Sequence, residues 1–150
     1  SVKERQPVAA LVGANGEILF IDHEGVQLPY SRFLNRADVP LLHGVIANGK
    51  IDTASLKVSA EILKNLRSLP EKTLLKTISE VHFNRLTRAF SVVSDAGVEI
   101  FLGNETLLPA SLQKLNDLWQ SQAIDKKTLN ELEYIDLRWQ GKVITRSRNA

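Results

Sequence analysis

Three histidines, His23, His43 and His82, are the side chains of this sequence best suited to bind a metal ion. They stand in three different local settings, and none belongs to a helix motif such as His-Glu-x-x-His. Distant histidines can converge in a fold, but His82, between two apolar neighbours, has the setting of an ordinary strand residue. The chain has no cysteine, which excludes disulfides, thiol nucleophiles and thiolate-bound metals. We therefore expect no metal and no cofactor.

Catalysis by a nucleophile or by paired carboxylates finds little support either. Ser31, Ser91 and Ser111 lack the Gly-x-Ser-x-Gly context of an activated serine. Two close carboxylate pairs lie in a turn and in a polar stretch, where solvated carboxylates are the ordinary expectation: Asp22 with Glu24, and Glu131 with Glu133. The short loop from Gly13 to Gly16 lacks the third glycine, the following helix and the lysine of a phosphate-binding loop. The sequence predicts no enzyme.

Length and composition fit one globular domain. The chain has 150 residues, of which 43% are hydrophobic and 24% charged, so disordered and collagen-like classes are excluded. No apolar run approaches the 18 or more residues, roughly, that a membrane span needs. The sequence holds no methionine and begins at Ser1. We expect it to be a processed product or a piece of a longer protein.

Basic residues gather near the C-terminus, although the net charge is only +2. They are Arg138, Lys142, Arg146 and Arg148. Nucleic-acid binders usually concentrate more charge than this on one face. The cluster fits a solvated face or the charge pattern of a sheet edge. An alternative function remains, in which a basic α/β domain binds nucleic acid or an acidic polymer.

Hydrophobic periodicity predicts an α+β fold. Residues 52–69 and 107–124 repeat apolar positions every 3.6 residues, which indicates two long amphipathic helices. Asp52 or Thr53 can cap the start of the first helix, and Pro70 closes its end. Residues 39–44 are expected to form a loop, and residues 125–133 a loop or a helical turn. The predicted strands cover residues 8–12, 17–21, 26–30, 78–83, 88–94, 97–102, 134–139 and 142–145. Several arrive as hairpins, so we expect a largely antiparallel, extended sheet with both helices packed on it.

The segment from Tyr134 to Trp139 shows the clearest alternation in the chain. Ile135, Leu137 and Trp139 share one face, and Tyr134, Asp136 and Arg138 share the other. Trp139 could anchor the core or face a partner. Arg138 could face a partner or pair across strands with Asp136 or another carboxylate.

The string Tyr-Ile-Asp-Leu-Arg-Trp at residues 134–139 resembles the signature of a bacterial cell-division family, FtsQ, called DivIB in Gram-positive species. Further motifs follow in family order. Residues 4–9 resemble the junction between its POTRA domain and its β-domain, residues 21–25 its D-x-x-G hairpin, and residues 40–44 its Leu-Pro-x-Leu-x-Gly loop. The two helices and the strands at residues 90–93 and 98–103 also fall in order.

This resemblance implies a non-enzymatic scaffold of the division septum. A family member has a short cytoplasmic tail, one transmembrane helix in the inner membrane, a POTRA domain and an extracytoplasmic β-domain on the periplasmic side. Here residues 1–9 would end the POTRA domain, residues 10–146 would form the β-domain, and residues 147–150 would be a C-terminal tail. The implied partners are the bitopic coiled-coil proteins FtsB and FtsL, and the implied role includes control of septal peptidoglycan synthesis.

The resemblance also implies where a partner binds. In the family, FtsB adds a strand at the C-terminal sheet edge, where unpaired backbone groups give affinity. By position, the expected partner-binding residues are Arg88, Tyr134, Asp136, Arg138, Trp139, Gln140, Gly141, Lys142, Val143 and Ile144. The chain departs from the family pattern in having Trp139 where tyrosine is frequent and Phe90 where tryptophan is frequent.

Overall fold

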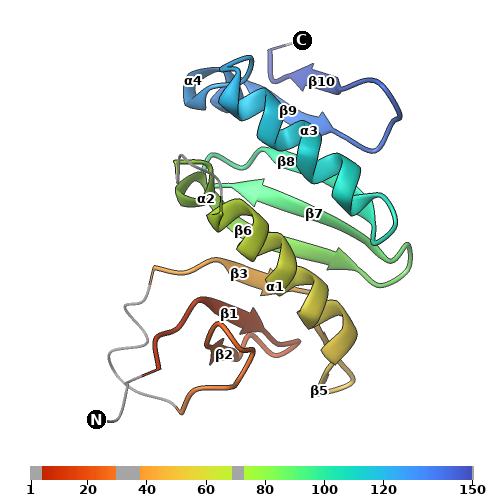
Figure 1. Ribbon diagram of the computed structural model, residues 1–150. Coiled ribbons are helices and arrows are strands. Elements are labelled where there is room, and N and C mark those ends of the chain that lie inside the picture. The colour runs from red at the N-terminus through yellow and green to blue at the C-terminus, as the bar shows by residue number, and fades with distance from the viewer. Residues whose placement is uncertain (1–4, 30–37, 69–72, 150) are drawn as a thin grey trace.

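An eight-stranded sheet forms the centre of the molecule (Figure 1). The computed structural model describes residues 5–29, 38–68 and 73–149. The strands follow the order β10-β9-β8-β7-β6-β3-β1-β2 across the sheet. They are β1 (Ala9–Val12), β2 (Ile18–Ile21), β3 (Leu41–His43), β6 (Ile78–Asn84), β7 (Ala89–Ser94), β8 (Glu99–Asn104), β9 (Leu132–Asp136) and β10 (Ile144–Ser147). A separate two-stranded hairpin holds β4 (Ile46–Ala47) and β5 (Lys50–Ile51).

Most neighbouring strands in the large sheet are antiparallel. This holds for β1–β2, β6–β7, β7–β8 and β9–β10, whereas β1–β3, β3–β6 and β8–β9 are parallel. Parallel neighbours need a long crossover, and the β8–β9 crossover contains two helices. The α+β fold with a largely antiparallel sheet is confirmed.

Four helices are present in the described part of the chain, and the two long ones cross one face of the sheet (Figure 1). They are α1 (Thr53–Arg67), α2 (Thr73–Thr77), α3 (Leu108–Gln120) and α4 (Lys126–Asn130). The Asp52 side chain accepts hydrogen bonds from Ala54 N and Ser55 N, and so caps α1 as predicted. The α3 helix ends four residues before position 124, because Gln122 has a φ of 60°, outside the helical range. Residues 125–133 contain a helical turn, α4.

The hydrophobic core lies between these helices and the sheet. Alternate residues of the central strands point into it, as the period of two requires. The strands contribute Val81, Phe83, Phe90, Val92, Ile100, Leu102 and Ile135, and the helices Leu56, Ile62, Leu63, Leu66, Leu108, Leu115 and Trp119.

The prediction of a loop at residues 39–44 is wrong, because Leu41–His43 forms β3 between β1 and β6. Three residues are too few to show an alternation in the sequence, and Pro40 and Gly44 on either side resemble loop punctuation. Gly44 is required here: its φ is +87°, and a Cβ would lie 2.0 Å from the carbonyl oxygen of Phe83.

Other predicted segments shift or shorten. Within residues 26–30, Gln27 makes a single isolated bridge to Ile21, and Tyr30 lies outside the described residues. Ser31 and Pro70 also lie outside them. Among the residues that the structure describes, no helix is both long and apolar enough to cross a membrane.

Substitution of two leucines, one buried and one exposed, tests the position of the hydrophobic core. Leu102, on β8, is fully buried, whereas Leu86, in the β6–β7 turn, is 97% exposed. We expect Leu102→Ala to lower the free energy of unfolding by about 2–5 kcal/mol, because it leaves a cavity. Leu86→Ala should change it by less than about 0.5 kcal/mol. Urea unfolding of both variants measures the difference, and equal losses would contradict this placement of the core.

Candidate functional site

The β9 strand ends at Asp136, so the strand predicted at residues 134–139 starts two residues earlier and stops three earlier. The cause is the Asp136 carboxylate, which accepts four hydrogen bonds from the next residues of the chain. Arg138 donates from its backbone N (3.0 Å), Nε (2.9 Å) and Nη2 (2.8 Å), and Trp139 donates from Nε1 (2.9 Å). These bonds turn the chain away from β8 and start the loop that leads to β10.

The Asp136 side chain is only 9% exposed and is held in its charged form. Hydrogen bonds from the Arg138 guanidinium, supported by those from Arg138 N and the Trp139 indole, lower its pKa from 3.8 to about 2. Burial opposes this shift but does not outweigh the bonds. Asp136 therefore acts by fixing Arg138 and Trp139, while its own oxygens point inward to them.

Arg138 lies on the sheet surface that carries Phe101 and Tyr134. Its guanidinium carbon is 4.8 Å from the centroid of the Phe101 ring, and the Phe101 and Tyr134 rings meet edge to face at 5.9 Å. Gly103 leaves room for the stem of Arg138, since a Cβ there would lie 3.3 Å from Arg138 Cγ. The alternative that Arg138 pairs with Asp136 is confirmed, but along the chain and not across strands.

Trp139 is 50% exposed and lies outside the buried core, so the core alternative is wrong. Its face is covered by Lys142, whose Nζ is 5.6 Å from the ring centroid. The strand alternation failed to place Trp139 because the regular strand has already ended at Asp136.

Helix α3 anchors the loop between β9 and β10. Lys114 Nζ donates to the carbonyl oxygens of Leu137 (3.1 Å), Lys142 (3.4 Å) and Trp139. From the same helix, Ser111 Oγ donates to Leu102 O (2.7 Å) on β8 and also lies 3.3 Å from Leu137 O. The sequence did not predict this role of Lys114. A lysine beside an apolar helix stripe gives the same sequence pattern whether its ammonium group is solvated or donates to backbone carbonyls.

The edge strand β10 pairs with β9 alone among the described strands. Its register joins Ile144 to Asp136, Thr145 to Ile135 and Arg146 to Tyr134, with an irregularity after Arg146. It starts two residues later than the predicted segment 142–145. Gln140 to Val143 therefore belong to the loop and not to the edge strand.

The opposite edge of the sheet, β2, is already occupied by the chain itself. Leu28 N donates to Phe20 O (2.8 Å), and Asp22 N donates to Val26 O (3.0 Å). The first bond uses an outward carbonyl of β2, and the second uses the amide that directly follows the strand. The two sheet edges therefore differ: the chain's own residues cover one, and β10 forms the other.

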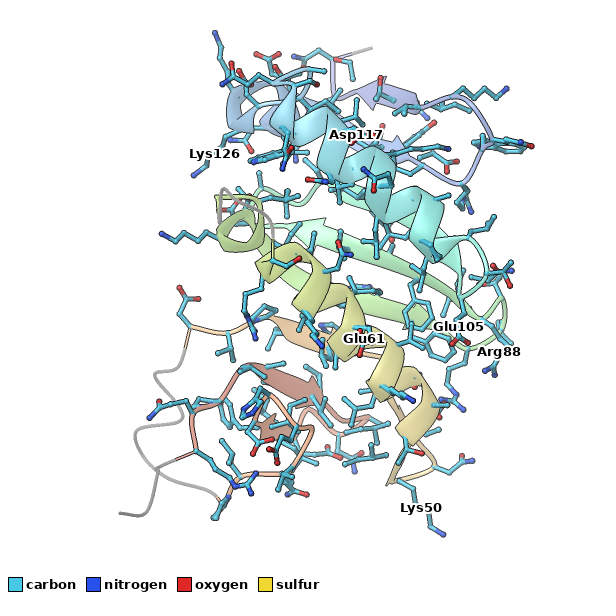
Figure 2. All side chains as sticks on the ribbon, in the orientation of Figure 1. Lys50, Glu61, Arg88, Glu105, Asp117 and Lys126 are labelled. Carbon is cyan, nitrogen blue, oxygen red and sulfur yellow. The ribbon has the colours of Figure 1, made fainter. Side chains whose placement is uncertain are left out.

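Arg88 is exposed in the turn between β6 and β7 (Figure 2). Asn84 Oδ1 organises this turn by accepting from Leu86 N (2.9 Å) and Thr87 N (3.2 Å), and Arg88 closes it with a φ of 57°. The guanidinium lies 5.7 Å from the Phe83 ring centroid. Because β9 runs parallel to β8 and antiparallel to β7, this turn lies at the same end of the sheet as the β9–β10 loop.

The C-terminal basic residues make contacts within the fold. Arg146 pairs with Glu133 at 3.1 Å, and Arg148 donates to the carbonyl oxygens of Leu132 (2.8 Å) and Ala96. A phosphate-binding track needs cationic groups aligned and available, which these contacts do not favour.

Of the candidate chemical residues, Ser91 and the pair Asp22 and Glu24 lie away from this edge, whereas Ser111 and Glu133 contact the β9–β10 region. Ser91 Oγ donates to Glu99 Oε2 (2.8 Å), so it is engaged with a carboxylate on the neighbouring strand. Arg5 bridges Asp22 and Glu24, and its hydrogen bond lowers the pKa of Asp22. Two of the three histidines, however, converge with a glutamate on the sheet face, which sequence reasoning did not predict.

The lowered pKa of Asp136 predicts a pH dependence of stability. Because the folded pKa lies below the ordinary value, the charged carboxylate stabilises the fold above about pH 4, and this contribution of about 2 kcal/mol is lost as the pH falls towards about 2. Asp136→Asn should be less stable than the original chain at neutral pH. The difference in their free energies of unfolding should become smaller as the pH falls from about 4 to about 2. Urea unfolding at several pH values measures it.

The exposed Asp117 on α3 provides the control, since Asp117→Asn removes a carboxylate outside the turn. That variant should stay within about 0.5 kcal/mol of the original chain throughout. A gap for Asp136→Asn that does not depend on pH would contradict the role given to its charge.

Two comparisons with known proteins agree with one another. The family described as "FtsQ/DivIB, C-terminal related" matches residues 6–146. The "Cell division protein FtsQ" of Salinibacter ruber (strain DSM 13855 / M31) is 28% identical over an alignment of 163 residues, which covers 99% of this chain and 58% of that protein. The chain thus spans little more than half the length of this relative. With nearly the whole chain matched, it belongs to the FtsQ/DivIB, C-terminal related family.

Proposed function

We propose that this domain is a non-enzymatic cell-division scaffold that binds an FtsB-type partner by strand addition at β10. Family membership and the name of the relative, a cell division protein, support the biological role. The observation that carries the binding mode is the unequal treatment of the two sheet edges, with β2 covered by the chain and β10 paired on one side only.

Strand addition fits the backbone of β10. An added strand bonds to the outward N–H and C=O groups of an edge strand, and the alternating side chains supply specificity. After the half-buried Ile144, the side chains of β10 are short or charged, and Thr145, Arg146 and Ser147 are exposed. Such an edge resists unspecific pairing, so a partner must offer matching polar or acidic groups.

The surface beside β10 supplies a second set of contacts. Trp139 presents a half-exposed ring, and Arg138 keeps 43% of its side chain exposed although it is bonded to Asp136. Tryptophan and arginine are the residues that most often dominate binding energy at interfaces. We propose that they contact the partner directly, while Asp136 holds them in place.

Arg88 extends the proposed interface along the same end of the sheet. Its charge is exposed on a turn fixed by Asn84. An acidic helix that follows the added strand of the partner would meet this charge. Across the sheet, β7 and β10 are three strand spacings apart, roughly 14 Å, which a short helix spans.

The remaining family expectations belong to the same proposal. The whole protein would cross the inner membrane once, carry a POTRA domain and this β-domain on the periplasmic side of the septum, and join FtsB and FtsL to the control of septal peptidoglycan synthesis. The proposed domains are residues 1–9, 10–146 and 147–150. The strands β1 and β10 extend to Ala9 and Ser147, one residue beyond the middle segment on each side. No observation favours nucleic-acid binding over this function.

A pair of proline variants tests the edge. Neighbouring residues of a strand direct their N–H groups to opposite sides, so Thr145→Pro and Arg146→Pro remove one inward donor and one outward donor. The variant that keeps the thermal stability of the original chain identifies the outward donor. We expect that variant to bind a synthetic peptide from the extracytoplasmic part of the organism's FtsB homologue at least about 10-fold more weakly, since it loses a bond of about 1 kcal/mol and blocks the edge.

Full affinity in the stable proline variant would contradict strand addition at β10. Surface plasmon resonance with the immobilised peptide gives both affinities under one condition.

A charge reversal tests the position of Arg88. Arg88→Glu should weaken binding of the same peptide on the order of 10-fold, because the reversed charge repels an acidic partner helix. Lys50→Glu makes the same change in net charge at an exposed residue of the separate β4–β5 hairpin, and it should leave the affinity unchanged. Equal effects of the two variants would mean that only overall charge matters and would remove Arg88 from the interface.

A further inference from the structure

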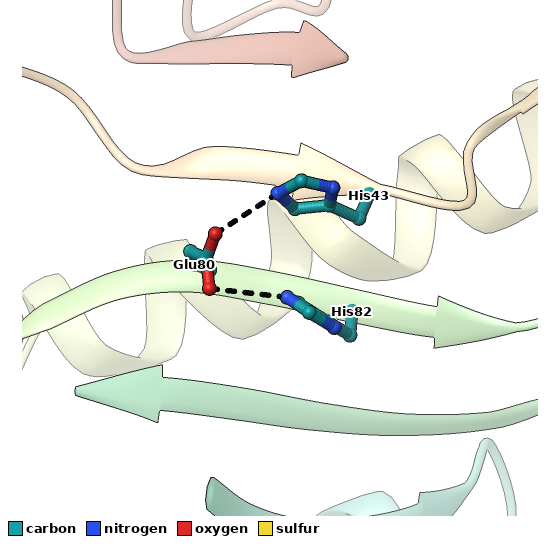
Figure 3. A group of neighbouring side chains, drawn as sticks. All are labelled: His43, Glu80 and His82. Carbon is teal, nitrogen blue, oxygen red and sulfur yellow. Dashed lines mark hydrogen bonds and ion pairs between the residues drawn. The ribbon is translucent and has the colours of Figure 1, made fainter. Parts of the chain in front are cut away.

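We propose that His43, Glu80 and His82 form a binding site for a divalent transition-metal ion of the zinc class. Their ligand atoms all lie within 4.8 Å of one another. Figure 3 shows the three side chains together on the sheet face opposite the helices. The proposal goes beyond the division role and uses none of the residues assigned to it.

The sheet register creates this cluster. The strands β3 and β6 run parallel, and His43 lies directly opposite His82. Glu80 precedes His82 by two residues, so the alternation of a strand puts both on the same face. The core side of the same strands is filled by Leu42 and Val81, which are fully buried. The three polar side chains therefore sit on a rigid backbone.

The two distances from histidine nitrogen to carboxylate oxygen are close to the ligand spacing of tetrahedral zinc, and the three ligand atoms, which lie within 4.8 Å of one another, would draw together around the ion. His43 Nε2 is 3.1 Å from Glu80 Oε1, and His82 Nε2 is 3.3 Å from Glu80 Oε2. Zinc binds nitrogen and oxygen ligands at about 2.0–2.2 Å, so two ligands of a tetrahedral ion lie about 3.3 Å apart. The present hydrogen bonds to Glu80 need a proton on each Nε2. Metal binding needs the neutral tautomer with that proton on Nδ1, which leaves both Nε2 lone pairs to the ion, so the ion would replace these hydrogen bonds.

The donor set and its exposure define the class of ion. Two imidazole nitrogens with one carboxylate favour zinc and its neighbours, whereas magnesium and calcium prefer oxygen ligands alone. The side chains of His43, Glu80 and His82 are 34%, 29% and 39% exposed. An ion can therefore enter without opening the fold, and water can fill the fourth position.

A metal at this place would join two parts of the sheet. The strand β3 has only three residues, yet it connects β1 and β2 to the strands from β6 to β10. A bond from His43 through the ion to β6 would strengthen that short seam. Three strands separate β6 from β10, so the site lies roughly 19 Å from the proposed partner edge and its test is independent of that proposal.

The direct test measures zinc binding to the intact domain after treatment with a chelator. Isothermal titration with zinc chloride should show one saturable ion per chain, and magnesium chloride should show none. His43→Ala and His82→Ala should each weaken zinc binding by more than about 10-fold, since loss of a residue behind a ligand already costs that much. Glu80→Gln should weaken it in the same direction.

His23→Ala is the matched control. His23 is exposed and lies beside Glu24, with 3.7 Å between its Nε2 and the carboxylate. The His23→Ala variant should therefore bind zinc as tightly as the original chain. Zinc should also raise the thermal midpoint of the original chain with increasing concentration, and slow hydrogen exchange of the β3 amides. His43→Gln and His82→Gln replace the alanine variants if circular dichroism shows that either is unfolded. The proposal is overturned by unsaturable binding, by zinc binding that survives loss of either histidine, or by its loss in His23→Ala.

Discussion

The carboxylate of Asp136 is the interaction on which the C-terminal edge of this domain depends. It ends β9 by capturing the backbone and side chain of Arg138 and the indole of Trp139, and so it sets the point at which the chain leaves the sheet. A charged group with so little exposure is stable only because each oxygen is hydrogen-bonded. Removing one side chain would therefore release the turn, two surface residues and the entry into β10 together.

The sheet around this turn combines rigidity with one available edge. The crossover from β8 to β9 places α3 over the sheet, where Lys114 and Ser111 hold the loop carbonyls that follow β9. At the far side, the chain folds residues 26–28 back on β2 and uses its outer groups. The chain thus covers one edge of the sheet and leaves the other as a short, polar strand. This arrangement suits the addition of one specific strand. This difference links the fold to the proposed scaffold function.

The sequence predicted well where a pattern was long and local. The stripe of α1 and its Asp52 cap need only the neighbouring residues, and the alternation around Ile135 and Leu137 correctly placed both in the core. Trp139 departed from the same alternation because a side chain-to-backbone bond ended the strand first. Such a bond competes with the sheet ladder and leaves no mark on the hydrophobic pattern.

Features that depend on register could not be predicted. The strand β3 is too short for periodicity, and it lies between two parallel neighbours with Leu42 fully buried. The meeting of His43 with Glu80 and His82 follows from that register alone, across 37 positions of sequence between His43 and Glu80. The hydrogen bonds of Lys114 to the loop carbonyls could not be predicted either, because they depend on the position of α3 over the loop. Resemblance to a family suggested the proposed partner edge, which the residues alone would not have identified.

Hydrogen–deuterium exchange of the β10 amides, with and without the FtsB-type peptide, tests strand addition most directly. An added strand protects the outward amides of β10, so we predict slower exchange there on binding and unchanged exchange in β2. Binding of the peptide without any change in β10 would contradict the account, because the partner would then use another surface.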